Sequence, residues 1–472
     1  MNPRRIRGLV LSSLAVLFAV NGANATPPNI VLVLTDDQGY GDLSCHGNPT
    51  VKTPNLDRLY RESVRFTDFH VCPTCTPTRC TLMSGRHEFR SGVSHTITMR
   101  CRMSLKATTI AQVLKSAGYT TGIFGKWHLG DAAPYQPDQR GFDEVFIHGA
   151  GGIGQRFPGS SDVPGNKHMK PIVLHNRVFE NTQGYCTDVF FDQAMKWISD
   201  VKGKKPFFAY IACNDPHDPQ ACPDAFAKPY ADKVEPRLAK YFGMVGHIDD
   251  NVGRLLAQLK QWDLERDTLL IYMSDNGGAT AVRHFNAGMR GSKGSPYQGG
   301  TRVPSFWRWP AGFKGGVDVD KLTAGIDLFP TLTEIAGAKM PKDLKLDGRS
   351  LVPLLKDPKA AWPDRYVFVH VGRWGKGKAA ESKYARCAVR SARYRLVNNR
   401  ELYDIRADPG ETKNILSDRA DVVAELRAAY DKWWEEVLPA LENENVEPPE
   451  VEPFPELYRK QQNDLKKPQE KG

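Results

Sequence analysis

Four continuous apolar runs dominate the pattern of hydrophobic and polar positions along the chain. They span residues 29–34, 120–125, 206–211 and 268–273. Because polar residues do not alternate regularly with apolar ones inside these runs, the pattern predicts strands that are buried on both faces. Strands of this kind are typical of parallel sheets that helices cover on either side.

Amphipathic helices are predicted between these strands. One runs from Thr109 to Ala117, where Gly118 ends it. A longer helix runs from Leu238 to Trp262 and keeps its apolar residues on one stripe. The alternation of strands and helices predicts an α/β fold: a large, mostly parallel sheet with helices on both faces.

The character of the chain changes after about residue 360. Short strand candidates lie at 366–369, 394–397 and 401–404. A helix follows, with its apolar face running from Val422 to Val437. We therefore expect a small α+β domain over residues 361–445, after a larger α/β catalytic domain over residues 26–360. Residues 446–472 are rich in Pro, Glu and Lys, which predicts an extended or disordered tail.

The first 25 residues resemble a secretory signal peptide. Three arginines, at positions 4, 5 and 7, precede an apolar run over residues 9–20, and small residues suit cleavage near Ala25. The run is too short for a comfortable transmembrane helix, and no later stretch is long enough. We therefore expect a periplasmic or secreted protein without stable membrane insertion.

The chain has 472 residues, a formal charge of +10 and a pI of about 9.0. Loss of the three N-terminal arginines lowers that charge from +10 to +7. A basic balance suits an anionic partner, such as a sulfated or phosphorylated molecule. No basic-aromatic motif accompanies the charge, so nucleic-acid binding is not predicted.

The predicted strands all end in polar residues. These include Asp36 and Asp37, Lys126 and His128, Asp215 and His217, and Asp275 and Asn276. Ligands of α/β sheets bind beyond the carboxyl ends of the strands, so we expect the functional site there. Two patterns are set aside: Gly149–Gly154 is interpreted as a flexible loop at the mouth of the site, and Asp249-Asp250 as the exposed face of a helix.

Four of these side chains offer hard oxygen ligands: Asp36, Asp37, Asp275 and Asn276. The set contains no imidazole or thiolate, so it favours Ca²⁺ or Mg²⁺ over Zn²⁺. Three carboxylates also slightly exceed the charge of one divalent cation.

The nine cysteines lie at positions 45, 72, 75, 80, 101, 186, 213, 222 and 387. After export, eight of them could form up to four disulfides of open connectivity, and the odd count leaves one thiol over. Cys72 and Cys75 also fit a C-x-x-C pattern, but no second pair supports a zinc site.

The segment Cys75-Thr76-Pro77-Thr78-Arg79, followed by Leu82-Met83-Ser84-Gly85-Arg86, resembles the signature of the formylglycine-dependent sulfatases. Further blocks resemble the same family in order: Asp36-Asp37-Gln38-Gly39, Gly125-Lys126-Trp127-His128-Leu129-Gly130, Pro216-His217-Asp218-Pro219, Ser274-Asp275-Asn276-Gly277, Lys293-Gly294, Gly299-Gly300-Thr301-Arg302-Val303-Pro304 and Glu401-Leu402-Tyr403-Asp404. The resemblance covers nearly the whole chain after the signal peptide.

The resemblance implies hydrolysis of a sulfate ester, carried by a small molecule or a glycan. It implies that a separate formylglycine-generating enzyme oxidises Cys75 to an aldehyde, formylglycine. It also implies one Ca²⁺, with Mg²⁺ less suited, held by Asp36, Asp37, Asp275, Asn276 and the modified Cys75.

The resemblance assigns further catalytic roles to Arg79, Lys126, His128, His217 and Lys293. The cations stabilise the charge that develops on the sulfate group and on the leaving oxygen. His217 or Lys293 protonates the leaving alcohol, and His128 removes the proton that releases sulfate. A helix that starts at Cys75 would add its positive N-terminal end to this site.

Two alternatives stay open. One is a phosphomonoester, phosphodiester or phosphonate hydrolase of the same superfamily, although Asn276 replaces the His that related enzymes use for a second zinc. The other is a non-catalytic secreted binder of sulfated glycans. Thr78 replaces a commoner Ser, and Gln298 replaces a frequent Glu, which leaves the role of position 298 open. Substrate subsites are expected in residues 150–186 and in the C-terminal domain; no oligomeric state is predicted.

Overall fold

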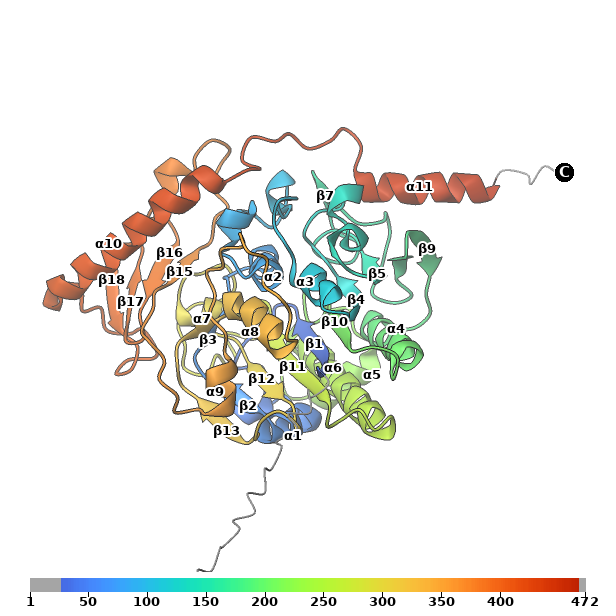
Figure 1. Cartoon of the computed structure of the whole chain (residues 1–472), viewed down its shortest axis with the longest axis horizontal. Helices are drawn as coiled ribbons and strands as arrows, with labels where there is room; N and C mark the ends of the chain where they lie inside the picture. Colours follow the sequence, from blue (N-terminus) through green and yellow to red (C-terminus); the bar gives the residue numbers. More distant parts are fainter. Residues whose placement is uncertain (1–26, 467–472) are drawn as a thin grey trace, which may run out of the picture.

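The computed structural model describes residues 27–466, so the predicted signal peptide lies outside it. A ten-stranded sheet forms its centre (Figure 1). In spatial order the strands are β13 (Val317–Val319), β2 (Val64–Phe66), β12 (Ser305–Arg308), β11 (Thr268–Ser274), β1 (Asn29–Thr35), β10 (Phe207–Ala212), β4 (Thr120–Lys126), β5 (Glu144–His148), β8 (Ile172–His175) and β9 (Val178–Asn181). The central five, from β11 to β5, run parallel, and antiparallel strands adjoin them on both sides. The predicted α/β fold is confirmed.

Helices cover both faces of the sheet because its strands are apolar on both faces. Ile30, Leu32 and Leu34 of β1 point to one layer, and Val31 and Val33 to the other. The first layer contains α2 (Cys75–Ser84), α3 (Ile110–Ser116), α8 (Leu328–Ile335) and α9 (Val352–Lys356). The second contains α1 (Pro54–Glu62), α4 (Cys186–Val201), α5 (Asp224–Ala227) and α6 (Pro236–Gln261).

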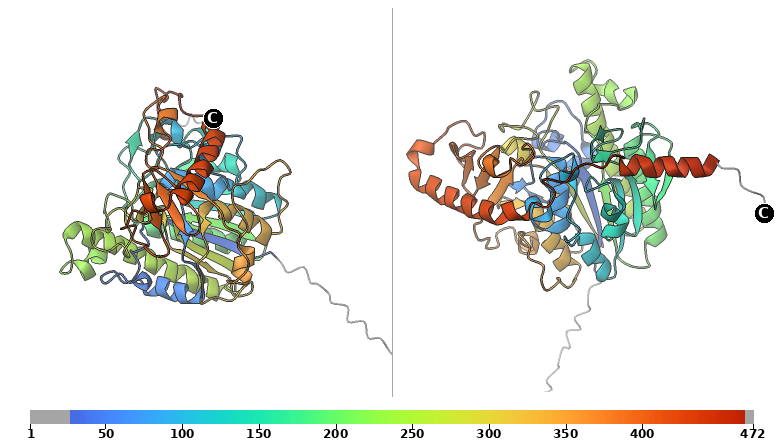
Figure 2. Two further views of the ribbon diagram at one scale, coloured as in Figure 1. Left: turned by 90° about the vertical axis from the view of Figure 1, so that its left-hand side faces the viewer. Right: turned by 90° about the horizontal axis from the view of Figure 1, so that it is seen from above.

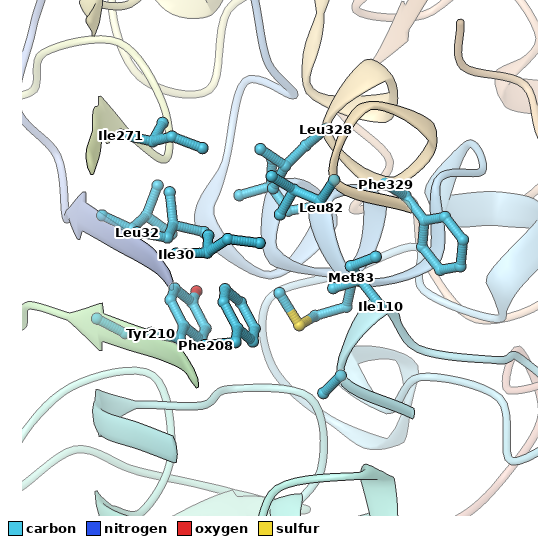
Figure 3. Packing of buried hydrophobic residues seen from close by; sticks show 14 of the residues in the cluster. Ile30, Leu32, Leu82, Met83, Ile110, Phe208, Tyr210, Ile271, Leu328 and Phe329 are labelled. Atoms are coloured by element: carbon cyan, nitrogen blue, oxygen red, sulfur yellow. The ribbon is translucent and has the colours of Figure 1, made fainter. Parts of the chain in front are cut away.

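Helix α2, which carries Cys75, packs in the layer on one face of the sheet. Leu82 and Met83 of α2 lie between the sheet and the α8 residues Leu328 and Phe329 (Figure 3). Every residue of α2 is buried. Burial of each such apolar side chain stabilises the fold by about 1.5–3 kcal/mol, so the helix is held firmly against the sheet.

Asp249 lies inside the protein, which corrects its interpretation as an exposed helix residue. Its side chain is 1% exposed, and it accepts hydrogen bonds from the backbone N–H groups of Asn55 and Leu56. These are free N–H groups at the start of α1. The sequence pattern of α6 alone could not reveal that another helix begins against it.

A second, four-stranded antiparallel sheet forms the C-terminal part. It consists of β15 (Val367–His370), β16 (Cys387–Arg390), β17 (Tyr394–Val397) and β18 (Glu401–Asp404). The helix α10 (Ala420–Val437) packs on it, where Trp433 stacks on Phe368 with ring centroids 4.9 Å apart (Figures 1 and 2). Two-stranded sheets also join β3 (Phe69–His70) to β14 (Thr323–Ala324), and β6 (Arg156–Phe157) to β7 (Ser160–Ser161).

The prediction of an extended or disordered tail is wrong for residues 453–466, which form a helix, whereas residues 446–452 form no helix or strand. After α10 the chain crosses back over the large domain and forms α11 (Pro453–Lys466) (Figures 1 and 2). Phe454 is 1% exposed, and its ring contacts that of Phe179 at a centroid distance of 5.1 Å. A few apolar residues at helical spacing thus hold a segment whose overall composition is polar.

No disulfide forms among the cysteines, which corrects the expectation of up to four bridges. All nine are free thiols, and seven of them are buried. They are distributed over separate parts of the core: Cys80 in the α2 layer, Cys186 and Cys213 in the opposite layer, and Cys387 in the C-terminal sheet. Here cysteine serves mainly as a small apolar residue.

We predict that Phe454→Ala releases α11 from the large domain. Truncation of a buried Phe costs about 3–5 kcal/mol, more than a short surface helix can lose without opening. Amide hydrogen exchange in residues 453–466 should accelerate, whereas Leu465→Ala, at a side chain 79% exposed, should leave it unchanged. Equal protection in both variants would contradict the packing role of Phe454.

Candidate active site

The site lies where the carboxyl ends of β11, β1, β10 and β4 meet the N-terminus of α2. Each of these strands ends in predicted site residues: Asp36 and Asp37 after β1, Lys126 and His128 at the end of β4, His217 after β10, and Asp275 and Asn276 after β11. α2 begins at Cys75 and carries Arg79 one turn later. Lys293 comes from the loop between β11 and the short α7 (Gln298–Thr301).

Three ion pairs connect the buried charges. Arg79 donates from Nε and Nη2 to Asp275 Oδ2, at 3.0 and 2.8 Å. Lys126 Nζ lies 2.6 Å from Asp36 Oδ2. Lys293 Nζ lies 2.6 and 2.7 Å from the two carboxylate oxygens of Asp37. Each of the three carboxylates therefore pairs with one Lys or Arg side chain. The sequence-based prediction compares their negative charge with that of a metal ion alone.

Two oxygens of the predicted metal set have no hydrogen-bond partner. Asp36 Oδ1 and Asn276 Oδ1 are both buried and unpaired in the described structure. Ligand atoms of Asp36, Cys75 and Asp275 lie within 4.8 Å of one another. An unpaired buried oxygen is costly, so this arrangement fits a cation that accepts hard oxygen ligands.

Asp37 contacts both Lys293 and Asn276. Its backbone has φ = 66°, and Asn276 Nδ2 donates to its Oδ1 at 2.9 Å. Burial would raise the pKa of its carboxyl group, but the charges of Lys293 and His217 outweigh burial and lower that pKa. Asp37 is therefore an ionised, pre-positioned oxygen donor.

Cys75 lies at the positive end of α2, within the electrostatic influence of Lys126 and Lys293. It is 3% exposed. Burial opposes ionisation of the thiol, but the charges of Lys126 and Lys293 lower its pKa below the usual value. Free N–H groups of the first helical turn add to this positive environment, which suits an anionic substrate group.

His128 follows β4 with φ = 60° and contacts the residue next to Cys75. Its Nε2 lies 2.7 Å from the carbonyl oxygen of Thr96, while Thr76 Oγ1 lies 3.0 Å from both Nδ1 and Nε2. Because a carbonyl can only accept, Nε2 carries the proton and Nδ1 keeps its lone pair. Burial, with Lys126 and Arg79, holds the pKa of His128 well below the usual value, so the ring is neutral.

His217 also lies beside Asp37. Its Nε2 lies 3.8 Å from Asp37 Oδ2, and its Nδ1 donates to the backbone carbonyl of Asp218 at 2.7 Å. The carboxylate of Asp218 instead pairs with Arg237 at 3.0 Å. The side chains of His217 and Lys293 are 11% and 20% exposed, more than those of Asp36, Asp37, Arg79, Lys126 and Asp275, so they border the entrance.

Several contact residues were not identified from the sequence. Thr76 occupies a variable position of the cysteine motif, and Thr96 lies outside every motif. Gly151 packs directly on His128, since a Cβ there would lie 2.4 Å from the imidazole ring. Residues 149–153 are buried, so this segment is a packed wall of the site and not the flexible loop that was expected.

Gln298 faces the C-terminal sheet. It is 2% exposed, and its Oε1 accepts from Arg395 Nη2 at 3.3 Å. Its backbone N–H donates to Glu411 at 2.8 Å, and Glu411 in turn pairs with Arg395. Gln298 therefore connects the two parts of the chain.

Comparisons with known proteins agree on one family. The family model described as Sulfatase matches residues 28–338, and the model of the N-sulphoglucosamine sulphohydrolase C-terminal region matches residues 292–435. Human arylsulfatase A is 33% identical over 464 aligned residues, which cover 88% of this chain and 89% of the relative. Mouse N-acetylgalactosamine-6-sulfatase is 32% identical over 395 residues, covering 77% and 72%.

A solved structure extends the likeness to three dimensions. The crystal structure of Ps i-CgsB in complex with k-i-k-neocarrahexaose aligns with a TM-score of 0.79 and 26% identity. The alignment covers 93% of this chain and 98% of that one.

We predict that Arg79→Met destabilises the protein by about 3–5 kcal/mol in the presence of a chelator. The substitution leaves the buried carboxylate of Asp275 without its cation. Urea unfolding should report the loss, and Arg61→Met, at an exposed arginine of α1, should change stability by less than about 0.5 kcal/mol. Similar effects of the two variants would mean that the Arg79–Asp275 pair does not hold the site together.

Proposed function

This chain belongs to the sulfatase family and hydrolyses sulfate esters, and from that premise we propose that it uses formylglycine formed from Cys75 together with a single Ca²⁺. The observation that carries the proposal is the position of Cys75. It occupies the first turn of α2, its sulfur lies within 4.8 Å of carboxylate oxygens of Asp36 and Asp275, and the charges of Lys126 and Lys293 act on it. One residue can there meet both a cation and an anionic substrate group.

The unpaired oxygens of Asp36 and Asn276 support the Ca²⁺ site. With Asp37, Asp275 and the modified residue 75, they offer the number and kind of ligands that Ca²⁺ prefers. Asn276 stands where related two-zinc enzymes place a His, which speaks against a second zinc. The imidazole that does join this cluster is that of His217, whose ligand atom lies within 4.8 Å of those of Asp36 and Asp37.

Charge balance supports an anionic substrate. The three carboxylates are already matched by Arg79, Lys126 and Lys293. A divalent cation therefore adds its two positive charges to a neutral cluster. In a water-poor site such charge binds a sulfate group strongly and stabilises the negative charge that develops as the S–O bond breaks.

Residue 75 acts as the nucleophile in this proposal. Formylglycine, when formed, supplies as its hydrate one hydroxyl that attacks sulfur and a second through which the sulfate group can be released. Lys126, Lys293 and the N-terminus of α2 would orient the sulfate oxygens in line with that attack. Arg79 would position Asp275 and the backbone of Lys126 through its hydrogen bonds to both.

Two groups would move protons. His217 and Lys293 border the entrance, where the leaving alcohol departs, so either can donate a proton to its oxygen. His128 is neutral and presents Nδ1 beside residue 76. It would accept the proton of the second hydroxyl when sulfate is released.

We propose export and a sulfated carbohydrate as substrate. Within residues 27–466, no helix combines the length and apolar character that a bilayer crossing requires. The mouse relative is named for N-acetylgalactosamine 6-sulfate chemistry, and the structural neighbour holds neocarrahexaose. Sulfated carbohydrates occur outside cells, which suits the predicted signal peptide over residues 1–25.

We predict that Cys75→Ala abolishes hydrolysis of an aryl sulfate while leaving the fold intact, because the nucleophile is lost. Cys80→Ala, a buried cysteine of the same helix, should retain most of the activity. Peptide mass spectrometry should find an aldehyde at residue 75 in active protein and a thiol in protein made without the maturing enzyme. Activity of the Cys75→Ala protein would refute the proposal, and a higher kcat/KM for an aryl phosphate would favour the phosphatase alternative.

We also predict that Ca²⁺ raises the melting temperature of chelator-treated protein. A ligand at 100 times its Kd stabilises the native state by about 2.7 kcal/mol. Asn276→Ala should weaken this stabilisation because it removes an unpaired buried oxygen, whereas Asn181→Ala, at an exposed residue of β9, should preserve it. Stabilisation by Zn²⁺ and not by Ca²⁺ would overturn the assignment of the metal.

A further inference from the structure

Two arginines of the C-terminal part lie at the edge of the active site. Arg373 and Arg386 both belong to the connection between β15 and β16. The backbone N–H of Val371 donates to the carbonyl of Arg386 at 3.0 Å, which closes this connection into a loop with a narrow neck. The connection that carries the two arginines therefore begins and ends at one point of the sheet.

Each arginine contacts a different catalytic segment. Arg386 Nη2 donates to the carbonyl of Gly294, the residue after Lys293, at 2.8 Å. Arg373 Nη2 donates to Thr96 Oγ1 at 2.7 Å, and the carbonyl of Thr96 binds His128. Arg386 thus adjoins the segment that carries Lys293, and Arg373 adjoins the residue that binds His128.

Neither guanidinium has a carboxylate partner among residues 27–466. Arg373 Nε is buried without a hydrogen bond, and Arg386 donates from its side chain only to Gly294. Glu444 lies nearby, but it binds Arg100, Ser94 and Trp374. Arg386 is exposed and Arg373 is half-buried. A half-buried guanidinium with a buried, unpaired Nε normally attracts a counter-charge, so Arg373 with Arg386 close to it points to an anionic ligand.

Two further features set these arginines apart. Both adopt the left-handed backbone conformation, with φ of 58° for Arg373 and 55° for Arg386, which costs free energy in a residue with a side chain. Burial and the charge of Arg373 also lower the pKa of Arg386, so the two groups repel each other. Both costs would be offset by an anion that bridges the guanidinium groups.

We propose that Arg373 and Arg386 form a subsite for a second anionic group, a sulfate or a carboxylate, on the same glycan whose sulfate ester is cleaved at residue 75. The planar guanidinium fork matches either group with paired hydrogen bonds. The inference rests on the proposed function and narrows the substrate to a polyanionic glycan. A small aryl sulfate has no second charge to place there.

Calorimetry on the full-length Cys75→Ala protein with bound Ca²⁺ tests the subsite without turnover. The probes are oligosaccharides from carrageenan, which carry further sulfates, oligosaccharides from chondroitin sulfate, which carry a uronate, and inorganic sulfate. We expect one oligosaccharide class to bind more tightly than inorganic sulfate. Arg373→Gln and Arg386→Gln should each weaken that preference about 10- to 100-fold, as expected for a lost charge-assisted hydrogen bond.

Controls separate a specific subsite from a general effect of charge. Arg406→Gln removes an exposed arginine from the same part of the chain and should leave the preference unchanged. The double variant of Arg373 and Arg386 should lose less than the two single losses combined, because both hold one anion. Three results would overturn the subsite. The Cys75→Ala protein without further changes could show no preference for an oligosaccharide, both single arginine variants could leave the preference unchanged, or Arg406→Gln could weaken it equally. Aryl sulfate hydrolysis by the matured wild type reports separately on the proposed function.

Discussion

The buried pair between Arg79 and Asp275 is the interaction on which the site depends. Arg79 lies on α2, Asp275 follows β11, and a third guanidinium nitrogen binds the carbonyl of Lys126 at the end of β4. One side chain therefore joins a helix to two strands. Because the pair is fully buried, its loss would leave an unpaired charge in a low-dielectric interior. The orientation of Cys75 follows from this connection.

The C-terminal part of the chain contacts segments that adjoin the site. Arg395 of β17 binds Gln298 and Glu411, whereas Arg386 donates to Gly294 and Arg373 to Thr96. A four-stranded sheet thus supports one wall of a pocket that the large sheet supplies with its ligands. The catalytic residues and the proposed substrate contacts thus lie on separate elements.

Sequence patterns predicted the parallel core well because strands buried on both faces produce unbroken apolar runs. They also predicted which residues follow those strands. They failed where one segment depends on a distant one. Asp249 looks like a surface residue until the start of α1 is placed against it, and Phe454 looks like part of a polar tail until Phe179 is found beside it. The cysteines were expected to form disulfides because their positions in the sequence do not reveal the distances between their sulfur atoms in the fold.

By itself, the sequence determined the class of fold, the residues at the strand ends and the resemblance of the cysteine motif to one family. These features are local, since they depend on a few neighbouring residues and on the periodicity of single elements. The tertiary structure alone decided which carboxylate pairs with which cation, which oxygens remain unpaired, and which arginines of the C-terminal part reach the pocket. Such facts depend on distances of a few ångströms between segments hundreds of residues apart, because hydrogen bonds and ion pairs weaken steeply with separation.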